Sequence, residues 1–284
     1  MFRKNVSLKN YTTFKIGGKA KYFYITQTKK DLTDAASMAK KLKLPFFVLG
    51  GGSNLLVSDK GFDGLVIKIE NCKLKIEKYK MVAEAGVPLG QLVSAATNVG
   101  LSGMEWAAGI PGTVGGAVYG NAGAFRKSMK DVVEKVEVFD TKDLEFKIYN
   151  SRDCKFSYRE SIFKKRKNLI IVSSILKLKK GEKFEIKKRI KEYVDYKIET
   201  QPLNYPSAGS VFKNPTKDFA AKLIEKCGLK GKKVNDAKIS EKHANFIVNL
   251  GKANEKDIKK LINLIKKEVK NKFGVVLEEE IQFL

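Results

Sequence analysis

The chain has 284 residues, of which 43% are hydrophobic and 31% are charged, a composition typical of a folded globular protein. No run of about 18 apolar residues occurs, and no apolar segment follows the basic residues near the N-terminus, so the sequence predicts neither a membrane span nor a secretory signal. The formal net charge is +25, but only six of the basic residues are arginines. Because nucleic-acid recognition relies on the planar fork of arginine, the charge favours small anionic ligands over a nucleic-acid partner.

The first half of the chain alternates helices, strands and glycine-rich turns. Residues 31–43 place five apolar side chains, including that of Leu42, on one helical face, which predicts an amphipathic helix. Residues 46–49 form a short apolar run that leads into three glycines and predicts a strand. Residues 64–82 alternate as strands do, and residues 88–99 predict a helix that ends at Gly100.

The second half mixes strands and helices without a regular repeat. Strands are predicted over residues 132–139, 144–149, 169–178, 245–249 and 275–284, the first two as a hairpin. Helices are predicted over residues 184–196, 217–227 and 254–273. Asn254 and Asp257 have the spacing of a capping box at the start of the last helix, and Gly274 follows its end. The order of elements predicts an α+β chain.

The cysteines and the histidine limit the chemistry. Cys72, Cys154 and Cys227 are odd in number and far apart, which argues against a disulfide framework or a zinc site and favours a reducing cytoplasm. His243 is the only histidine, which excludes a site with several histidine ligands, so no metal is expected.

Two glycine-rich segments carry the strongest functional signal. Residues 50–56 read GGGSNLL, and residues 109–117 read GIPGTVGGA within a stretch that has six glycines between positions 109 and 123. Neither matches the G-x-G-x-x-G fingerprint or a P-loop. Small residues let the backbone approach a large flat ligand, and two loops of backbone N–H groups suit a dinucleotide such as FAD. Tight turns without a ligand are the alternative reading.

Three polar segments carry weaker signals, each with a structural alternative. Arg159, in CKFSYRES, could bind a carboxylate or form an ordinary ion pair. Ser210, in QPLNYPSAGSVFKNP, could be functional or a simple turn residue, and no Ser-His-Asp order supports a hydrolase. In Glu278–Glu280, alternation places the first and last carboxylates on one face, as on a surface strand.

Taken in order, these segments resemble the family of UDP-N-acetylenolpyruvoylglucosamine reductases, flavoenzymes of early peptidoglycan synthesis. The matching segments run from residue 11 to residue 281: YTTFKIGGKA, VLGGGSNLLVSDKGFDGLVI, GMEWAAGIPGTVGGAVYGNAGAF, CKFSYRES, QPLNYPSAGSVFKNP, GLKG, ISEKHANFIVN and LEEEI. The resemblance covers essentially the whole chain.

The resemblance implies an FAD-binding fold of the vanillyl-alcohol-oxidase type in residues 1–178, with two α+β subdomains at about 1–64 and 65–178. A smaller α+β substrate-binding domain would follow in residues 179–284, its last strand returning towards the flavin. In the implied reaction, NADPH reduces FAD, and flavin N5 then delivers hydride to UDP-N-acetylglucosamine enolpyruvate to give UDP-N-acetylmuramate. We expect a cytoplasmic monomer that binds neither nucleic acid nor membrane.

Motif matches assign residues to roles. Arg159 would hold the substrate carboxylate, Ser210 would protonate the substrate carbanion, and Glu280 would be the third catalytic residue. Residues expected at the cofactor are Gly50, Gly51, Gly52, Ser53, Asn54, Leu55, Gly109, Ile110, Pro111, Gly112, Thr113, Gly115, Gly116, Ala117, Asn121, Ala122 and Gly123. Residues expected at the substrate are Tyr158, Arg159, Lys213, Asn214, Lys230, His243 and Asn245. The glycines would leave room for the flavin, so that bulk at Gly115 would displace it.

The sequence departs from the family pattern in three places. Residues 234–237 read VNDA where glycine is common, and Gln282 stands where arginine is frequent. The stretch between residues 176 and 209 is too short for a tyrosine-bearing loop, which indicates the shorter subclass. Two alternatives stay open: another FAD-dependent oxidoreductase of the same fold, which the Arg159, Ser210 and Glu280 trio disfavours, and a basic protein that binds anions or nucleic acid.

Overall fold

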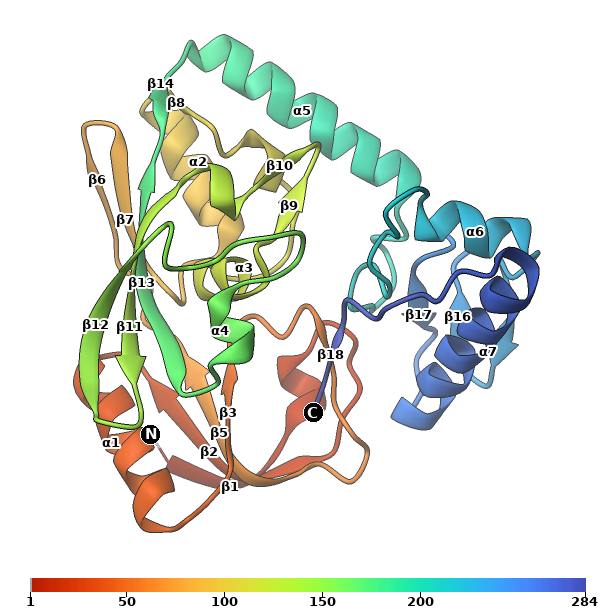
Figure 1. The fold of residues 1–284 in the computed structure, drawn as a ribbon, viewed down its shortest axis with the longest axis horizontal. Helices are drawn as coiled ribbons and strands as arrows, with labels where there is room; N and C mark the ends of the chain where they lie inside the picture. The colour runs from red at the N-terminus through yellow and green to blue at the C-terminus, as the bar shows by residue number, and fades with distance from the viewer. Residues whose placement is uncertain (1) are drawn as a thin grey trace. The chain divides into compact units, whose positions relative to one another are not determined.

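The structure, a computed structural model, describes residues 2–284 and divides into two compact units (Figure 1). Unit 1 contains residues Tyr22–Gly51 and Gly64–Tyr196 together with residues 2–3. Unit 2 contains residues Lys4–Lys21, Gly52–Asp63 and Lys197–Leu284. Residues 4–21 and 52–63 therefore belong to the same unit as the C-terminal part of the chain. The expected domain bounds of 1–178 and 179–284 stay a prediction.

Two sheets supply the strands of unit 1, and the second of them also includes residues that belong to unit 2. A five-stranded antiparallel sheet has the order β12-β11-β13-β7-β6, and its strands run side by side in Figure 1. Their bounds are β6 Leu74–Glu77, β7 Lys80–Glu84, β11 Val133–Asp140, β12 Glu145–Asn150 and β13 Leu169–Lys177. A second sheet, in which β3 and β5 are parallel, has the order β1-β2-β5-β3. Its bounds are β1 Phe2–Ser7, β2 Lys19–Thr26, β3 Phe46–Leu49 and β5 Phe62–Ile69.

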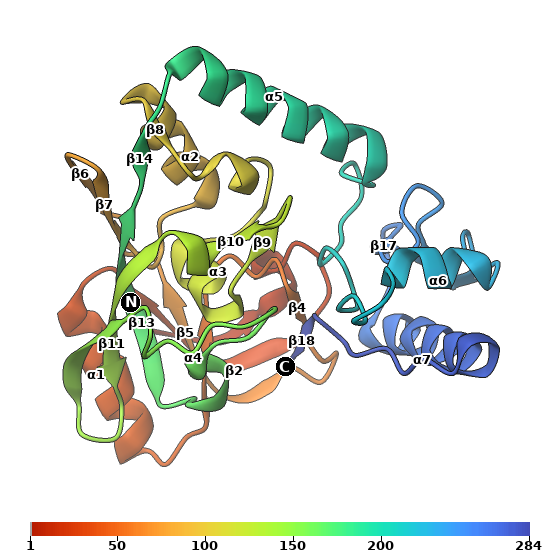
Figure 2. The same cartoon turned by 45° about the horizontal axis from the view of Figure 1, so that its top comes forward.

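Helices and short connections complete unit 1. The helices are α1 Lys29–Lys41, α2 Leu89–Asn98, α3 Val114–Gly120 and α4 Ile162–Lys165, with 3-10 turns η2 Glu105–Ala107 and η3 Met129–Asp131. Short strands pair as β8 Leu101–Ser102 with β14 Lys179–Lys180, and as β9 Gly123–Ala124 with β10 Lys127–Ser128. Figure 2 shows α3 beside the β9–β10 hairpin. The long helix α5, Lys183–Thr200, leaves unit 1 at residue 196.

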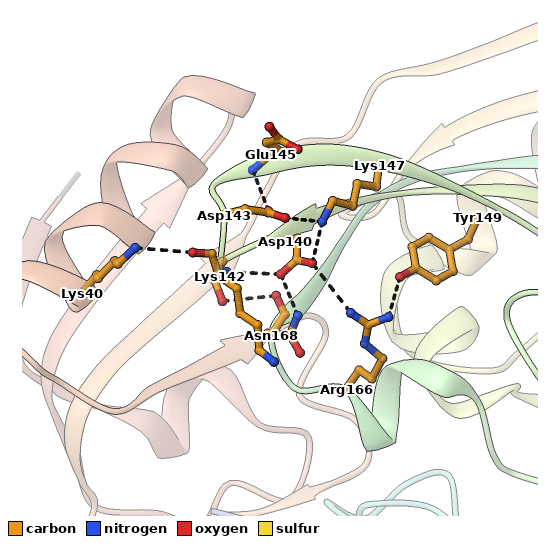
Figure 3. Close-up of polar contacts among 10 residues, drawn as sticks. Lys40, Asp140, Lys142, Asp143, Glu145, Lys147, Tyr149, Arg166 and Asn168 are labelled. Atoms are coloured by element: carbon orange, nitrogen blue, oxygen red, sulfur yellow. Dashed lines mark hydrogen bonds and ion pairs between the residues drawn. The ribbon is translucent and has the colours of Figure 1, made fainter.

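The structure confirms the predicted hairpin as β11–β12. The buried side chain of Asp140, at the end of β11, stabilises it (Figure 3). The side chain of Asp140 is 3% exposed, and its carboxylate accepts from Asn168 Nδ2 at 2.6 Å and from Lys147 Nζ at 3.0 Å. The guanidinium of Arg166 is a third partner, with Nη2 3.8 Å from Asp140 Oδ2. Burial raises the pKa of Asp140, but these hydrogen bonds outweigh burial and lower the pKa overall.

The β9–β10 turn has an unfavourable sequence for its shape. Phe125 and Arg126 connect the strands as a two-residue turn, and their φ angles are 51° and 61°. Asn and Gly usually fill both positions of such a turn because bulky side chains rarely adopt positive φ. The Phe125 ring stacks on Tyr193 of α5, with centroids 3.9 Å apart, which offsets part of the strain.

Unit 2 is built around helices α6 and α7, which lie side by side in Figures 1 and 2. Its elements are η1 Leu8–Tyr11, β4 Leu55–Leu56, α6 Ala220–Lys226, β15 Lys233–Val234, β16 Ala237–Ile239, β17 Ile247–Asn249, α7 Glu255–Phe273 and β18 Gln282–Phe283. The predicted capping box of Asn254 and Asp257 is confirmed, and Gly274 ends α7 with φ 68°. A core of its own holds this unit, including Phe14, Ile258 and Leu277.

The prediction of a continuous strand over residues 275–284 is wrong. Only Gln282–Phe283 is a strand, paired with β4, and Glu279 forms an isolated bridge with Phe212. The side chain of Val276 is exposed, so the alternation does not mark a buried face there. Period-two alternation indicates extended backbone, whereas a strand also needs a partner along its length. Across residues 2–284, no helix is long and apolar enough to cross a bilayer.

Candidate active site

The two predicted glycine loops meet in unit 1. Gly50 and Gly51 directly follow the end of β3. A β-carbon built on Gly50 would lie 2.8 Å from Thr113 Oγ1, and one built on Gly51 would lie 2.9 Å from Gly112 Cα. The backbones of two segments far apart in the sequence thus touch, and at Gly51 only glycine permits this approach. The first loop continues from Gly52 to Leu55 in unit 2.

The glycines of α3 differ in their surroundings. A β-carbon on Gly115 would lie 2.8 Å from Ala85 Cβ, so bulk at this position would collide with Ala85 whatever else is bound. A bulky substitution at Gly115 therefore cannot test whether this residue contacts FAD, and the contact stays a prediction. Gly116 and Gly120 are open instead: the nearest described atom to their β-carbons is Thr113 Oγ1, 3.7 Å from Gly116. Because these glycines are four residues apart, α3 presents one bare face.

Arg159 is tied to the loop that follows α3. Its φ of 57° lies in the left-handed region, and its Nη2 donates to the carbonyl of Gly123 at 2.8 Å. The side-chain amide of Asn121 donates to the carbonyl of Ser157 in the same turn, at 2.7 Å. The Arg159 guanidinium also lies 5.2 Å from the ring centroid of Tyr158. The structure therefore brings Arg159 together with two residues expected at the cofactor.

Lys68 is a residue that the sequence analysis missed. It lies on β5 opposite Leu49 of β3, and its half-buried ammonium donates to the carbonyl of Gly50 at 2.8 Å. Burial lowers the pKa of Lys68, while the charge of Glu70 opposes this effect. A single charge inside the apolar run GLVIKI is the signal that could have identified it.

Ser210 begins an extended segment that pairs on two sides within unit 2. Ser210 bridges Phe246 on one side. On the other side, the N–H of Glu280 donates to the carbonyl of Val211 at 2.7 Å. The side-chain amide of Asn54 in turn donates to the carbonyl of Glu280 at 3.0 Å. The backbone of unit 2 thus gathers two expected catalytic residues and one residue of the first glycine loop.

Asn245 supports this segment through its side chain. It is 3% exposed, and its Oδ1 accepts from the N–H of Phe212 at 3.0 Å while its Nδ2 donates to the carbonyl of Phe212 at 2.8 Å. Its own carbonyl accepts from the N–H of Val211 at 2.8 Å. The oxygen and the nitrogen of the Asn245 side-chain amide are thus both bonded to the backbone of Phe212, two residues after Ser210. A direct contact of Asn245 with substrate stays a prediction.

Three other residues of unit 2 that are expected at the substrate, Lys213, Asn214 and Lys230, contact other residues of the protein. Lys213 Nζ lies 3.4 Å from a carboxylate oxygen of Glu278, and Asn214 Oδ1 accepts from the N–H of Ala220 at 3.0 Å, at the start of α6. Lys230 forms an ion pair with Glu225 at 2.7 Å. These three residues therefore have structural partners besides any ligand.

The ring of His243 is partly unsatisfied. Burial and the nearby charge of Lys230 lower the pKa of His243, which favours the neutral form of the ring. Its ring lies edge-on to Phe246, with centroids 4.8 Å apart. Its Nδ1 is buried and has no hydrogen-bond partner among the described residues. Such atoms are rare in folded proteins, and a bound ligand is one way to complete them.

The expected site residues fall into two groups. Residues 50–51, 109–123 and 158–159 belong to unit 1, and residues 52–55, 210–214, 230, 243–245 and 280 belong to unit 2. Of the three expected catalytic residues, Arg159 lies in the first group, and Ser210 and Glu280 lie in the second. A groove of about 590 Å³ in unit 1, lined by residues 131–134, 150–152 and 177–179, contains no expected site residue.

The VNDA departure does not remove the turn that glycine would serve. Val234 pairs with Ala237 in the β15–β16 hairpin, and Asn235 between them has φ 49°. Asparagine tolerates this left-handed region better than most residues. The amide of Asn235 also donates to Asp257 Oδ1 at 2.8 Å, which fixes the turn against α7.

Comparisons with known proteins extend over both units. Residues 20–144 match the sequence model of the FAD binding domain, and residues 201–284 match that of the C-terminal domain of UDP-N-acetylenolpyruvoylglucosamine reductase. The reductase of Caldicellulosiruptor bescii is 46% identical over 100% of this chain and 90% of its own length. That of Caldanaerobacter subterraneus subsp. tengcongensis is 45% identical over 99% and 92%. The crystal structure of the Thermus caldophilus reductase (MurB) superimposes with a TM-score of 0.85 at 39% identity, covering 100% of this chain and 99% of that one.

Proposed function

Because the chain belongs to the UDP-N-acetylenolpyruvoylglucosamine reductase family, we propose that it reduces UDP-N-acetylglucosamine enolpyruvate to UDP-N-acetylmuramate in peptidoglycan synthesis. NADPH would be the reductant and FAD the bound cofactor. The observation that carries the proposal is the meeting of the two glycine loops in unit 1, beside the bare face of α3.

The residues of unit 1 fit a flavin dinucleotide. The backbones of Gly50 and Gly51 against Gly112 form a surface with few side chains, on which N–H groups can bind diphosphate oxygens. The open positions at Gly116 and Gly120 leave space that β-carbons would fill. When bound, FAD would accept hydride from NADPH and supply it to the methylene carbon of the enolpyruvyl group.

Arg159 would hold the substrate carboxylate. Addition of hydride to the enolpyruvyl double bond places negative charge on the carbon next to that carboxylate, and a bidentate guanidinium stabilises the charge as it develops. The bond from Arg159 to the Gly123 carbonyl and the left-handed turn supply the orientation in advance. A preoriented charge needs no reorganisation during the reaction.

Ser210 would donate the proton that completes the reduction. Its hydroxyl is a weak acid, but a substrate carbanion is a far stronger base than serine alkoxide, so the transfer is downhill. The pairing of the Ser210 segment with Phe246 and with Glu280 supports a fixed position for this hydroxyl. Glu280, whose N–H donates to the carbonyl of Val211, would assist the proton supply from the adjacent segment.

The cationic side chains would bind the anionic parts of the substrate. Lys213 and Lys230 are candidates for the diphosphate, and the unpaired Nδ1 of His243 in its neutral form is a candidate hydrogen-bonding group for the sugar or uracil. The overall charge of +25 would attract both polyanionic substrates from solution.

The test follows the flavin absorbance of the purified protein without oxygen. We expect a yellow protein that NADPH bleaches, and whose colour returns when UDP-N-acetylglucosamine enolpyruvate is added. A protein that takes up no FAD would contradict the cofactor assignment. A flavin that NADPH bleaches but the enolpyruvyl substrate fails to reoxidise would instead indicate another FAD oxidoreductase.

A further inference from the structure

Lys68 carries a charge that the described part of the chain does not neutralise. Its ammonium donates to the Gly50 carbonyl at 2.8 Å and approaches the Ile69 carbonyl at 3.5 Å. No carboxylate lies within 4.0 Å of its Nζ among residues 2–284, and Glu70 acts on it only from a longer distance. A half-buried ammonium with only carbonyl partners loses hydration without gaining a counter-charge, which is unfavourable for the protein alone.

The fold places this charge under the first glycine loop. Alternation along β5 sends Leu65, Ile67 and Ile69 into the core of unit 1, and Lys68 to the opposite face. The parallel register with β3 sets Lys68 beside Leu49, the residue before Gly50. Both the strand pairing and the alternation therefore direct the ammonium to the loop expected to hold the cofactor diphosphate.

We propose that Lys68 is part of the diphosphate site of the flavin cofactor, where its ammonium supplies the counter-charge for the anion held by the glycine loop. This inference rests on the proposed function, because it requires that the loop binds a dinucleotide. In this role the diphosphate of the cofactor supplies the missing counter-charge. Cofactor binding therefore compensates the free energy that burial of the Lys68 ammonium costs. The burial that lowers the pKa of Lys68 is the same desolvation, and a bound anion would oppose it.

The test measures FAD affinity of the cofactor-free protein by the change in flavin fluorescence. Lys68→Met removes the charge at nearly equal length, and we expect it to weaken FAD binding by about 10- to 100-fold, the effect of losing one charge-assisted contact. Lys68→Arg keeps the charge and should bind FAD within a few-fold of the wild type. Lys75→Met, on an exposed position of β6 in the same unit, is the matched control and should bind FAD as the wild type does.

Two further measurements separate this role from support of the loop alone. Lys68→Gln can still donate to the Gly50 carbonyl but has no charge, so it should resemble Lys68→Met; wild-type affinity in this variant would overturn the proposal. Added salt should weaken FAD binding to the wild type more than to Lys68→Met, because salt screens the lost attraction. Without FAD, Lys68→Met should melt no lower than the wild type, whereas a purely structural lysine would leave it less stable.

Failure of this inference differs from failure of the proposed function. Equal FAD affinity in the wild type and Lys68→Met would overturn the role of Lys68 and leave the reductase assignment intact. Absence of FAD binding by the wild type would overturn the reductase assignment and this inference with it.

Discussion

Replacing Asn245 with alanine should loosen the segment that carries Ser210. The substitution removes two buried hydrogen bonds, leaving the N–H and the carbonyl of Phe212 without side-chain partners. Each unsatisfied buried group costs about 1–3 kcal/mol, so losing both bonds should reduce local stability by about 2–6 kcal/mol. The backbone bond from the Val211 N–H to the Asn245 carbonyl is retained, so the segment should remain in place but open more often.

Amide hydrogen exchange at Phe212 is the appropriate assay. A chain with two compact units need not unfold in one step, so a residue-level measurement is better defined than a global transition. The expected loss corresponds to exchange at Phe212 that is about 30- to 20,000-fold faster. Asn263→Ala, at an exposed position of α7, is the control and should leave this rate unchanged.

An aspartate at the same position gives a pH signature. Asn245→Asp keeps an acceptor for the Phe212 N–H but sets a second carboxylate oxygen against the Phe212 carbonyl. A protonated carboxyl would restore the donor, so the folded-state pKa should be raised, and protection at Phe212 should increase as pH falls through that pKa. If Asn245→Ala exchanged at the wild-type rate at Phe212, or Asn245→Asp showed no pH dependence, the support assigned to Asn245 would be refuted.

Three other predictions concern the framework of unit 1. Asp140→Ala should lower the free energy of unfolding by about 1.5–3 kcal/mol in urea, because it removes the hydrogen bonds that the buried carboxylate accepts from Asn168 and Lys147, whereas Asp143→Ala at the exposed end of the network should change it by less than about 0.5 kcal/mol; equal effects would contradict the role of the buried carboxylate. Arg126→Gly should raise the thermal midpoint, since removing a side chain from a left-handed turn position gains about 1 kcal/mol, and a lower midpoint would show that the turn is unstrained. Burial raises the pKa of Cys154 to about 12, so a thiol reagent at neutral pH should modify exposed Cys72 in the native protein and Cys154 only after unfolding; early labelling of Cys154 would contradict its burial.

Local signals in the sequence were read correctly where the partner lies nearby. The capping box of Asn254 and Asp257 and the closing glycine of α7 are contacts within a few residues, and the structure has both. The β11–β12 hairpin was likewise predictable, because a short turn fixes which strands pair.

Contacts between distant segments could not be derived in the same way. The side-chain partner of Asn245 is Phe212, thirty-three residues earlier, and nothing in the motif around Asn245 indicates it. Gly51 and Gly115 look alike as glycines, yet both are needed for packing against other parts of unit 1, whereas Gly120 faces open space. Lys68 was visible as a charge in an apolar run, but its target depends on the β3–β5 register, which the sequence does not reveal.

The most direct test of the central claim compares the wild type and Ser210→Ala by stopped-flow absorbance of the bound flavin. If Ser210 supplies a proton to the substrate and takes no part in the NADPH reaction, Ser210→Ala should retain FAD and be reduced by NADPH at nearly the wild-type rate. Its reoxidation by UDP-N-acetylglucosamine enolpyruvate should be slower by about 10²-fold or more, the usual effect of losing a positioned acid. A Ser210→Ala protein that reoxidised at the wild-type rate, or that lost reduction by NADPH instead, would contradict the account.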